Sequence, residues 1–217
     1  MHPLGYQQML SFAVGNIHPI GDVPLRIMDL GSWSDGPSTY TYKSMFTQQP
    51  SWEYVGVDIQ DGYNVDVVLE DPYVWNELED DSFDVVISGQ CLEHVEFPWL
   101  TIKEIARVMK NEALCCIIVP SVGPVHAVKE CGIEGFDMLD CYRYKPHGMM
   151  ALAKWAELIP LYISIYTDEI GPCGEENIFD DITFVGMKTD KQLSVEELLE
   201  MRRLISMPDV SEIVAAM

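Results

Sequence analysis

Positive charge is scarce in this chain. Its 217 residues include 13 lysines and arginines against 35 aspartates and glutamates, which gives a formal net charge of −22. No lysine or arginine occurs between Ser44 and Ile102. A surface of this sign repels phosphate backbones, so we expect no nucleic-acid partner. We interpret the acidic character mainly as a source of solubility, with attraction of a positively charged ligand as a secondary interpretation.

Long apolar runs and metal-type cysteine pairs are also missing. The sequence has no stretch of about eighteen apolar residues, which predicts no membrane span. Its first residues lack a basic region followed by a long apolar run, so we expect no secretory signal. The six cysteines form neither a Cys-x-x-Cys pair nor a zinc-type spacing. Free thiols in a cytoplasmic protein are the expectation that follows.

Length and apolar content indicate one globular domain over residues 1–217. With 48% apolar residues, a chain of this length can bury a sizeable core. Strands that alternate with helices predict an α/β fold, with a mostly parallel sheet and helices on both faces. The last two expected strands have only a loop between them, which predicts an antiparallel pair. The expected strands are residues 25–30, 53–59, 64–70, 83–87, 113–119, 161–166 and 181–187. The expected helices are a leading helix within residues 1–20, then 37–47, 98–110, 148–158 and a C-terminal helical region within 193–217.

The most informative stretch is a glycine turn between two strands that end in acids. The first strand ends at Asp29, the turn runs from Gly31 to Gly36, and the second strand ends near Asp58. Glycines let a ligand approach the backbone at a helix N-terminus, and an acid on the second strand can accept hydrogen bonds from both hydroxyls of a ribose. A nicotinamide enzyme would have a third glycine in this turn. The pattern therefore predicts a Rossmann-like sheet with an adenosine-containing cofactor and disfavours a dinucleotide.

Four short segments together resemble a known family. They are Asp29-Leu-Gly31, Gly56-Val-Asp58-Ile, the run from Ser82 to His94, and the run from Glu104 to Lys110. In this order and spacing they are similar to class I S-adenosylmethionine-dependent methyltransferases, specifically the type 11 methyltransferase domain. The resemblance extends from about Leu25 to Trp155. It implies a seven-stranded sheet with a reversed final strand, in agreement with the antiparallel pair expected above.

The resemblance also implies cofactor contacts for the glycine turn and the two acids. The turn with Gly31, Ser32 and Gly36 would lie under the methionine portion of S-adenosylmethionine, with Asp29 near its ammonium group. Asp58 would hold the ribose. The alternatives are a loop-capping role for Asp29 and a solvated strand end for Asp58. We prefer the cofactor interpretation for both, because open α/β sheets bind ligands at this edge.

Further cofactor contacts are implied after the second, third and fourth strands. Ile59 would pack on the adenine, and Asp71 would approach the adenine amino group. Ser88 to Gln90 would line the cofactor beside the reacting methyl group. The alternatives are a solvated turn formed by Glu70 and Asp71, and a structural amide at Gln90.

Glu93 and His94 form a pair with two interpretations. Some relatives of this fold hold a divalent metal with a Glu-x-x-Glu-His run and a later histidine. Here Gln90 occupies the first position, which removes one oxygen charge from such a site. We therefore predict no metal and favour packing of His94 in a helical turn, with metal binding as the alternative.

Residues 121–150 are expected to cover the substrate side of the cofactor. His126, followed by the run from Asp140 to His147, resembles a pattern of type 11 methyltransferases, many of which are encoded with surface-polysaccharide genes. His126 is the candidate general base, and its alternative is a structural pairing with Asp140. Tyr142 and Arg143 are candidates for the substrate side. For Arg143, the alternative role is to fix the loop through a carboxylate.

The sequence as a whole therefore predicts an S-adenosylmethionine-dependent methyltransferase that acts on a small-molecule or sugar-type acceptor by in-line methyl transfer. The alternative is a non-catalytic protein that binds S-adenosylmethionine or another adenosine ligand. A nicotinamide oxidoreductase is a distant third interpretation. The sequence identifies neither the acceptor nor the oligomeric state.

Overall fold

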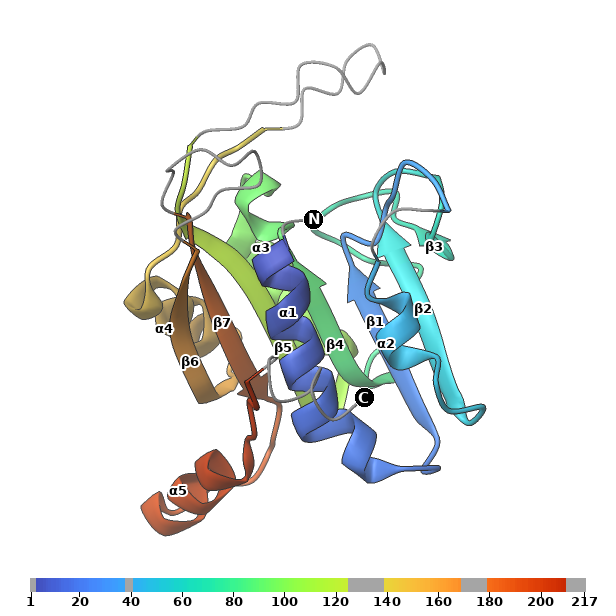
Figure 1. Cartoon of the computed structure of the whole chain (residues 1–217). Coiled ribbons are helices and arrows are strands. Elements are labelled where there is room, and N and C mark those ends of the chain that lie inside the picture. The colour runs from blue at the N-terminus through green and yellow to red at the C-terminus, as the bar shows by residue number, and fades with distance from the viewer. Residues whose placement is uncertain (1–2, 38–40, 125–138, 169–178, 210–217) are drawn as a thin grey trace.

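A seven-stranded sheet organises the computed structural model, which describes residues 3–37, 41–124, 139–168 and 179–209 (Figure 1). The order of the strands across the sheet is β3-β2-β1-β4-β5-β7-β6. The strands are β1 (Leu25–Leu30), β2 (Trp52–Asp58), β3 (Val67–Val68), β4 (Phe83–Gly89), β5 (Met109–Val122), β6 (Ile159–Asp168) and β7 (Phe179–Met187). The α-helices are α1 (Pro3–Phe12), α2 (Lys43–Phe46), α3 (Pro98–Val108), α4 (Pro146–Trp155) and α5 (Val195–Leu204). Short helical turns are η1 (Ala13–Ile17), η2 (His18–Ile20) and η3 (Leu92–His94).

The direction of the strands changes only at one side of the sheet. Strands β1 to β5 pair in parallel, whereas β7 pairs antiparallel with both β5 and β6. The predicted Rossmann-like α/β fold, with its mostly parallel sheet and antiparallel end, is confirmed. The reversal follows from the short connection between β6 and β7, because a parallel pair would need a long crossover.

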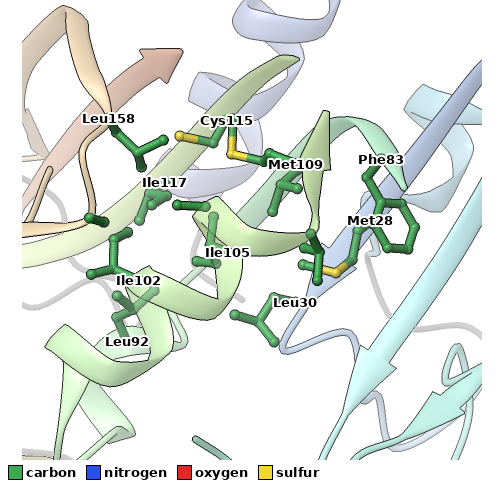
Figure 2. Packing of buried hydrophobic residues seen from close by; sticks show 14 of the residues in the cluster. Met28, Leu30, Phe83, Leu92, Ile102, Ile105, Met109, Cys115, Ile117 and Leu158 are labelled. Carbon is green, nitrogen blue, oxygen red and sulfur yellow. The ribbon is translucent and has the colours of Figure 1, made fainter. Parts of the chain in front are cut away.

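Helices cover both faces of the sheet because side chains alternate along each buried strand. On one face, Met28 of β1 and Ile117 of β5 pack with Ile102 and Ile105 of α3 (Figure 2). On the other face, Ile27 and other strand residues pack with α1 and α2. The buried members of this second cluster include Met9, Phe12, Phe46, Ile87, Cys116 and Ile118. Helices therefore cover both faces of the sheet. The polar edge at the ends of the strands is left as the place where a ligand can bind.

Several elements are shorter or longer than the sequence predicts. The third strand is only Val67–Val68, because Asn64 has a positive φ of 67° that interrupts the extended run expected over 64–70. The expected helix 37–47 is reduced to α2, which buries Met45 and Phe46 directly. Strand β5 extends beyond the expected 113–119, because its long antiparallel pairing with β7 continues to Val122.

The C-terminal helix lies within the expected region. Helix α5 stops at Leu204, and Ser206 and Pro208 beyond it hydrogen-bond to Asn16 of η1 and Ser11 of α1. There, Asn16 Nδ2 donates a 2.6 Å hydrogen bond to the carbonyl of Ser206, and Ser206 N donates one of 3.0 Å to Asn16 Oδ1. Within the described ranges, no helix has the length and apolar character needed to cross a membrane. The treatment of residues 1–217 as one domain stays a prediction.

Candidate functional site

The carboxyl ends of three neighbouring strands bring the predicted cofactor residues together. Leu30 of β1 pairs with Val57 of β2 on one side and with Ser88 of β4 on the other. Asp29 and Asp58 therefore lie at the same edge of the sheet as Ser88. Loops that follow parallel strands meet at this edge, which is where open α/β sheets bind ligands.

The turn after β1 is held close to β2 and β4. Gly31 has a positive φ of 81°, and its amide donates a 2.9 Å hydrogen bond to the carbonyl of Val57. A Cβ atom at Gly31 would lie 2.6 Å from Cβ and 2.7 Å from Sγ of Cys91. Both the backbone conformation and the close approach of Cys91 therefore require glycine here. At Gly36, the other glycine of the turn, a Cβ atom would have no neighbour within 4 Å.

Ser32 offers a polar atom at the same turn. Its side chain is buried, and its Oγ has no hydrogen-bond partner among the described residues. The carbonyl of Ser32 accepts a 3.0 Å hydrogen bond from Asn64 Nδ2, which fixes the backbone of the turn. A buried hydroxyl without a partner is uncommon in proteins and is consistent with a ligand that supplies the missing contact.

Asp29 is buried at the end of β1. Its Oδ2 accepts a 2.5 Å hydrogen bond from the hydroxyl of Tyr54, and this hydroxyl accepts a 2.9 Å bond from Asn64 Nδ2. The pKa of Asp29 is raised to about 7, mainly by burial; the hydrogen bond from Tyr54 opposes this shift, and the negative charge of Asp58 adds to it. A carboxyl group with this pKa gains its charge readily when a cation arrives.

Asp58 is arranged as an acceptor at the end of β2. Its Oδ2 accepts a 3.0 Å hydrogen bond from the amide of Trp33, and its Oδ1 accepts one of 3.0 Å from the amide of Gln60. Burial raises the pKa of this carboxyl, and the amide bonds oppose the shift. Each oxygen uses one lone pair in these contacts, which leaves both oxygens able to accept from the hydroxyls of a ribose. The next residue, Ile59, has 39% of its surface exposed, so its side chain is accessible to a ligand ring.

Asp71 has a different environment. It is exposed, and its Oδ1 accepts hydrogen bonds of 2.7 Å from the amide of Tyr73 and 3.2 Å from the amide of Val74. These are the contacts of an aspartate that stabilises a turn. They favour the solvated-turn interpretation, and the contact of Asp71 with adenine stays a prediction.

Ser88 and Gln90 lie at the tip of β4. Ser88 is fully buried, and its Oγ donates a 3.0 Å hydrogen bond to the carbonyl of Leu30. Gln90 has a positive φ of 58°, and its backbone amide donates a 2.9 Å bond to Ile118. Its side-chain Nε2 is buried and has no hydrogen-bond partner in the described part of the chain. Ser88 thus supports the backbone, whereas the amide of Gln90 is available to a ligand.

The Glu93–His94 pair lies in η3, directly after β4. Nδ1 of His94 is 2.6 Å from the carbonyl of Leu139, and its Nε2 is 3.7 Å from Oε1 of Glu93. The backbone contact supports the predicted packing role of His94 in a turn. In the ranges that the structure describes, no group of three metal-type side chains has the arrangement of a metal site. The prediction that no metal is used remains to be tested.

The substrate-side segment is anchored by its own contacts. The guanidinium of Arg143 pairs with both carboxylate oxygens of Asp140, and its Nε donates a 3.3 Å bond to the carbonyl of Gly123. These contacts favour the alternative in which Arg143 fixes the loop. Tyr142 donates a 2.8 Å hydrogen bond to the carbonyl of Glu96. His126, the candidate base, lies outside the described residues.

Sequence reasoning missed Tyr54, which supports Asp29. The alternation of side chains along β2 could have indicated this contact, because Tyr54 and Gly56 face the same side of the sheet. Gly56 pairs with Asp29, so Tyr54 is a diagonal neighbour of this aspartate. The register of β1 against β2 is needed to see this, and the sequence alone does not supply it.

Comparison with known proteins identifies the class of domain. Residues 43–117 match the methyltransferase domain family. This segment is similar to methyltransferase domains. It runs from α2 into β5 and contains Asp58, Ser88, Gln90 and Glu93. Among curated proteins, no sequence matches the chain significantly. The predicted family and enzyme class are confirmed at the level of this domain.

Solved structures with the same fold include methyltransferases of low sequence identity. A chain of a Haloferax volcanii complex that contains the Trm112 methyltransferase activator is 16% identical, with a TM-score of 0.60 over 87% of this chain and 91% of that one. An S-adenosylmethionine-dependent methyltransferase of Methanosarcina mazei is 14% identical, with a TM-score of 0.57 over 81% and 97%. The 1,6-didemethyltoxoflavin-N1-methyltransferase of Burkholderia thailandensis is 14% identical, with a TM-score of 0.57 over 85% and 80%. These likenesses extend the methyltransferase fold to most of the chain, beyond the matched domain.

Proposed function

We propose that the protein transfers a methyl group from S-adenosylmethionine to a nucleophile on a small molecule. One observation carries the proposal: Asp29, the Gly31 turn and Asp58 meet at the carboxyl edge of the sheet. Several strands of this sheet belong to the segment that matches the methyltransferase domain family. The buried acid Asp29 suits the amino acid group of the cofactor, and the tight turn at Gly31 allows the cofactor to approach the backbone closely. Asp58 has two remaining acceptor positions, which suit the hydroxyls of a ribose.

The residues present fit this cofactor. Asp58 would accept from the two ribose hydroxyls, and Ile59 would pack on the adenine. Asp29 would face the ammonium group of the methionine portion, and the unpaired Oγ of Ser32 would complete a hydrogen bond to it. The amide of Gln90 would lie beside the methyl group. These five roles rest on the fit of the residue types and positions at one edge.

The chemistry requires alignment more than activation by the protein. A methyl group bound to a sulfonium is already electrophilic, and the leaving sulfide is neutral. The protein therefore has to hold the nucleophile in line with the carbon–sulfur bond and to exclude water. A hydroxyl or ammonium acceptor must also lose a proton. His126 remains the sequence-based candidate for this step.

A small-molecule acceptor is supported by charge and by one related structure. A chain with a net charge of −22 is a poor partner for nucleic acid. The toxoflavin N1-methyltransferase, solved with 1,6-didemethyltoxoflavin and S-adenosylhomocysteine, shows that this fold accommodates a small acceptor in another protein. A related structure is part of a complex with Trm112, so a protein partner is a second possible arrangement. A cytoplasmic location remains the expectation from the cysteine pattern.

Calorimetry with S-adenosylmethionine, S-adenosylhomocysteine and NAD tests the cofactor. We expect both sulfur ligands to bind and NAD to bind far more weakly. Incubation with methyl-labelled S-adenosylmethionine and a metabolite extract then tests transfer, with the Asp58→Ala variant as the control. Tighter binding of NAD would overturn the cofactor. Cofactor binding without label transfer to any fraction would instead support the non-catalytic alternative.

A further inference from the structure

Three buried polar side chains carry atoms that lack a hydrogen-bond partner within the described part of the chain. Gln8 of α1 is 3% exposed, Tyr42 is 1% exposed and Glu93 is 0% exposed. Among the described residues, Nε2 of Gln8, the hydroxyl of Tyr42 and both carboxylate oxygens of Glu93 have no hydrogen-bond partner in another residue. Such groups are normally paired inside proteins, because burial without a partner is unfavourable. Their presence in three separate segments points to a missing ligand.

Contacts of Gly5 and Gln8 place α1 close to the tips of β4 and β7. A Cβ atom at Gly5 would lie 3.6 Å from Nε2 of Gln90 and 3.8 Å from Oδ2 of Asp181. One turn further along, Gln8 Oε1 accepts a hydrogen bond from the hydroxyl of Thr183 on β7. The backbone of Gly5 therefore lies next to the side chains of Gln90 and Asp181.

Tyr42 connects this region with the proposed cofactor edge. A Cβ atom at Gly89 would overlap its hydroxyl oxygen, so the phenol lies directly on the tip of β4. Burial raises the pKa of Tyr42 well above its usual value, and the charges of Asp29, Asp181 and Glu93 contribute. These acids are thus within electrostatic reach of one phenol. We call Gln8, Tyr42, Gln90, Glu93 and Asp181 the α1 chamber.

The chamber has a negative character. The pKa of Glu93 is raised to about 8, mainly by burial, with a contribution from the charges of Asp181 and Asp140. Arg143 opposes this shift, but its guanidinium is paired with Asp140 and with backbone carbonyls. Nε2 of His94 also lies 3.7 Å from Oε1 of Glu93. A cation that enters the chamber would stabilise the ionised form of Glu93.

We propose that the α1 chamber binds the amino group of the methyl acceptor, with Glu93 as its counter-ion. The inference rests on the proposed function and narrows the acceptor to a small-molecule amine. An ammonium group donates several hydrogen bonds, and Glu93 supplies two acceptor oxygens for them. The donors on Gln8, Gln90 and Tyr42 suit an oxygen elsewhere on the acceptor. The net charge of the chain also attracts a cationic acceptor.

The proposed step balances without a further reactant. The bound ammonium gives one proton to the carboxylate of Glu93, which leaves a neutral amine with a free electron pair. This pair forms the nitrogen–carbon bond while the carbon–sulfur bond breaks and its electrons remain on sulfur. The product leaves as a methylated ammonium ion, and Glu93 returns its proton to the solvent. A carboxyl group with a raised pKa is better matched to an amine than an ordinary one.

Small ammonium ions and their alcohol analogues test the chamber directly. Ethylammonium is compared with ethanol, and benzylammonium with benzyl alcohol, by thermal shift and calorimetry at pH 8. Potassium chloride keeps the ionic strength constant, and EDTA removes divalent metals. The wild type, Glu93→Gln and Glu96→Gln are measured with and without S-adenosylhomocysteine. Glu96 is an exposed neighbour, so its variant is a control with the same change of charge.

We expect at least one ammonium ion to bind the wild type and Glu96→Gln, and its affinity to fall at least tenfold in Glu93→Gln. The alcohols should bind all three proteins equally weakly. Equal binding of ammonium and alcohol in the wild type, or equal ammonium binding in all three proteins, would overturn the proposal. Failure of S-adenosylhomocysteine to bind the wild type would count against the proposed function instead. The measurements without S-adenosylhomocysteine would then still decide whether Glu93 binds ammonium.

Discussion

The hydroxyl of Tyr54 donates a 2.5 Å hydrogen bond to Oδ2 of Asp29 across the adjoining strands β2 and β1. This contact holds a buried carboxyl at the proposed cofactor edge while the pKa of Asp29 stays near 7. The carboxyl is therefore close to its titration point in the free protein at neutral pH. Arrival of the cofactor ammonium group would favour its ionised form.

The affinity for S-adenosylhomocysteine should rise between pH 6 and pH 8. Below its pKa of about 7, Asp29 is neutral and attracts the ammonium group of the ligand less strongly. Calorimetry across this range should show the rise in the wild type and a much flatter dependence in Asp29→Asn. A slope that is unchanged in the variant would assign the titration to another group.

Stability should depend on pH in the opposite direction. In the unfolded chain, Asp29 loses its proton near pH 4, whereas in the folded protein it keeps the proton up to about pH 7. Between these values the folded state binds more protons, so the contribution of Asp29 to the free energy of unfolding falls as the pH rises. Asp29→Asn removes this contribution. Denaturant unfolding at pH 5 and pH 8 should show a smaller loss of stability in the variant than in the wild type.

Gly31→Ala should weaken both folding and cofactor binding. The added Cβ atom would lie 2.6 Å from Cβ of Cys91, and the φ of 81° is unfavourable for alanine. We expect a loss of about 1–3 kcal/mol in the free energy of unfolding. Gly36→Ala is the matched control, because its Cβ atom would meet nothing within 4 Å. Equal stability of the two variants would show that Cys91 moves aside without penalty.

Asp58→Ala should reduce the affinity for S-adenosylhomocysteine by about 1–3 kcal/mol, the loss expected when ligand hydroxyls lose a charged acceptor. Calorimetry measures the affinity, and circular dichroism checks the fold. Asp58 also accepts from the amides of Trp33 and Gln60, so Asp58→Asn separates charge from loop support. Its amide oxygen can preserve one of these contacts. Unchanged affinity of a folded Asp58→Ala protein would remove Asp58 from the site.

The sequence predicts the sheet and its acid-tipped strands because these features repeat over short distances. Asp29 and Asp58 follow apolar runs, and parallel strands bring such positions to one edge. The contact of Tyr54 with Asp29 depends on strand register, which no local pattern specifies. The position of α1 over Gln90 and Asp181 depends on tertiary packing. The shortened third strand depends on a single positive φ at Asn64.

Catalysis should not require a divalent metal. Gln90 occupies the first position of the metal-binding run known from relatives of this fold, and its neutral amide binds a cation less strongly than a carboxylate. Turnover in EDTA should therefore equal turnover in its absence. Complete loss of activity, restored by magnesium, manganese or cobalt, would instead assign Glu93 and His94 to a metal.

The pH dependence of kcat/KM should identify which group takes the proton of an amine acceptor. If Glu93 is the proton acceptor, kcat/KM should rise through its pKa of about 8, and Glu93→Gln should remove this rise. Loss of a general base lowers turnover by about 10²- to 10⁴-fold. His126→Ala should then keep the rise and change mainly KM. The opposite result is a rise that is lost in His126→Ala and kept in Glu93→Gln. It would make His126 the base. Binding of ammonium by Glu93, measured separately, would then define Glu93 as a binding residue only.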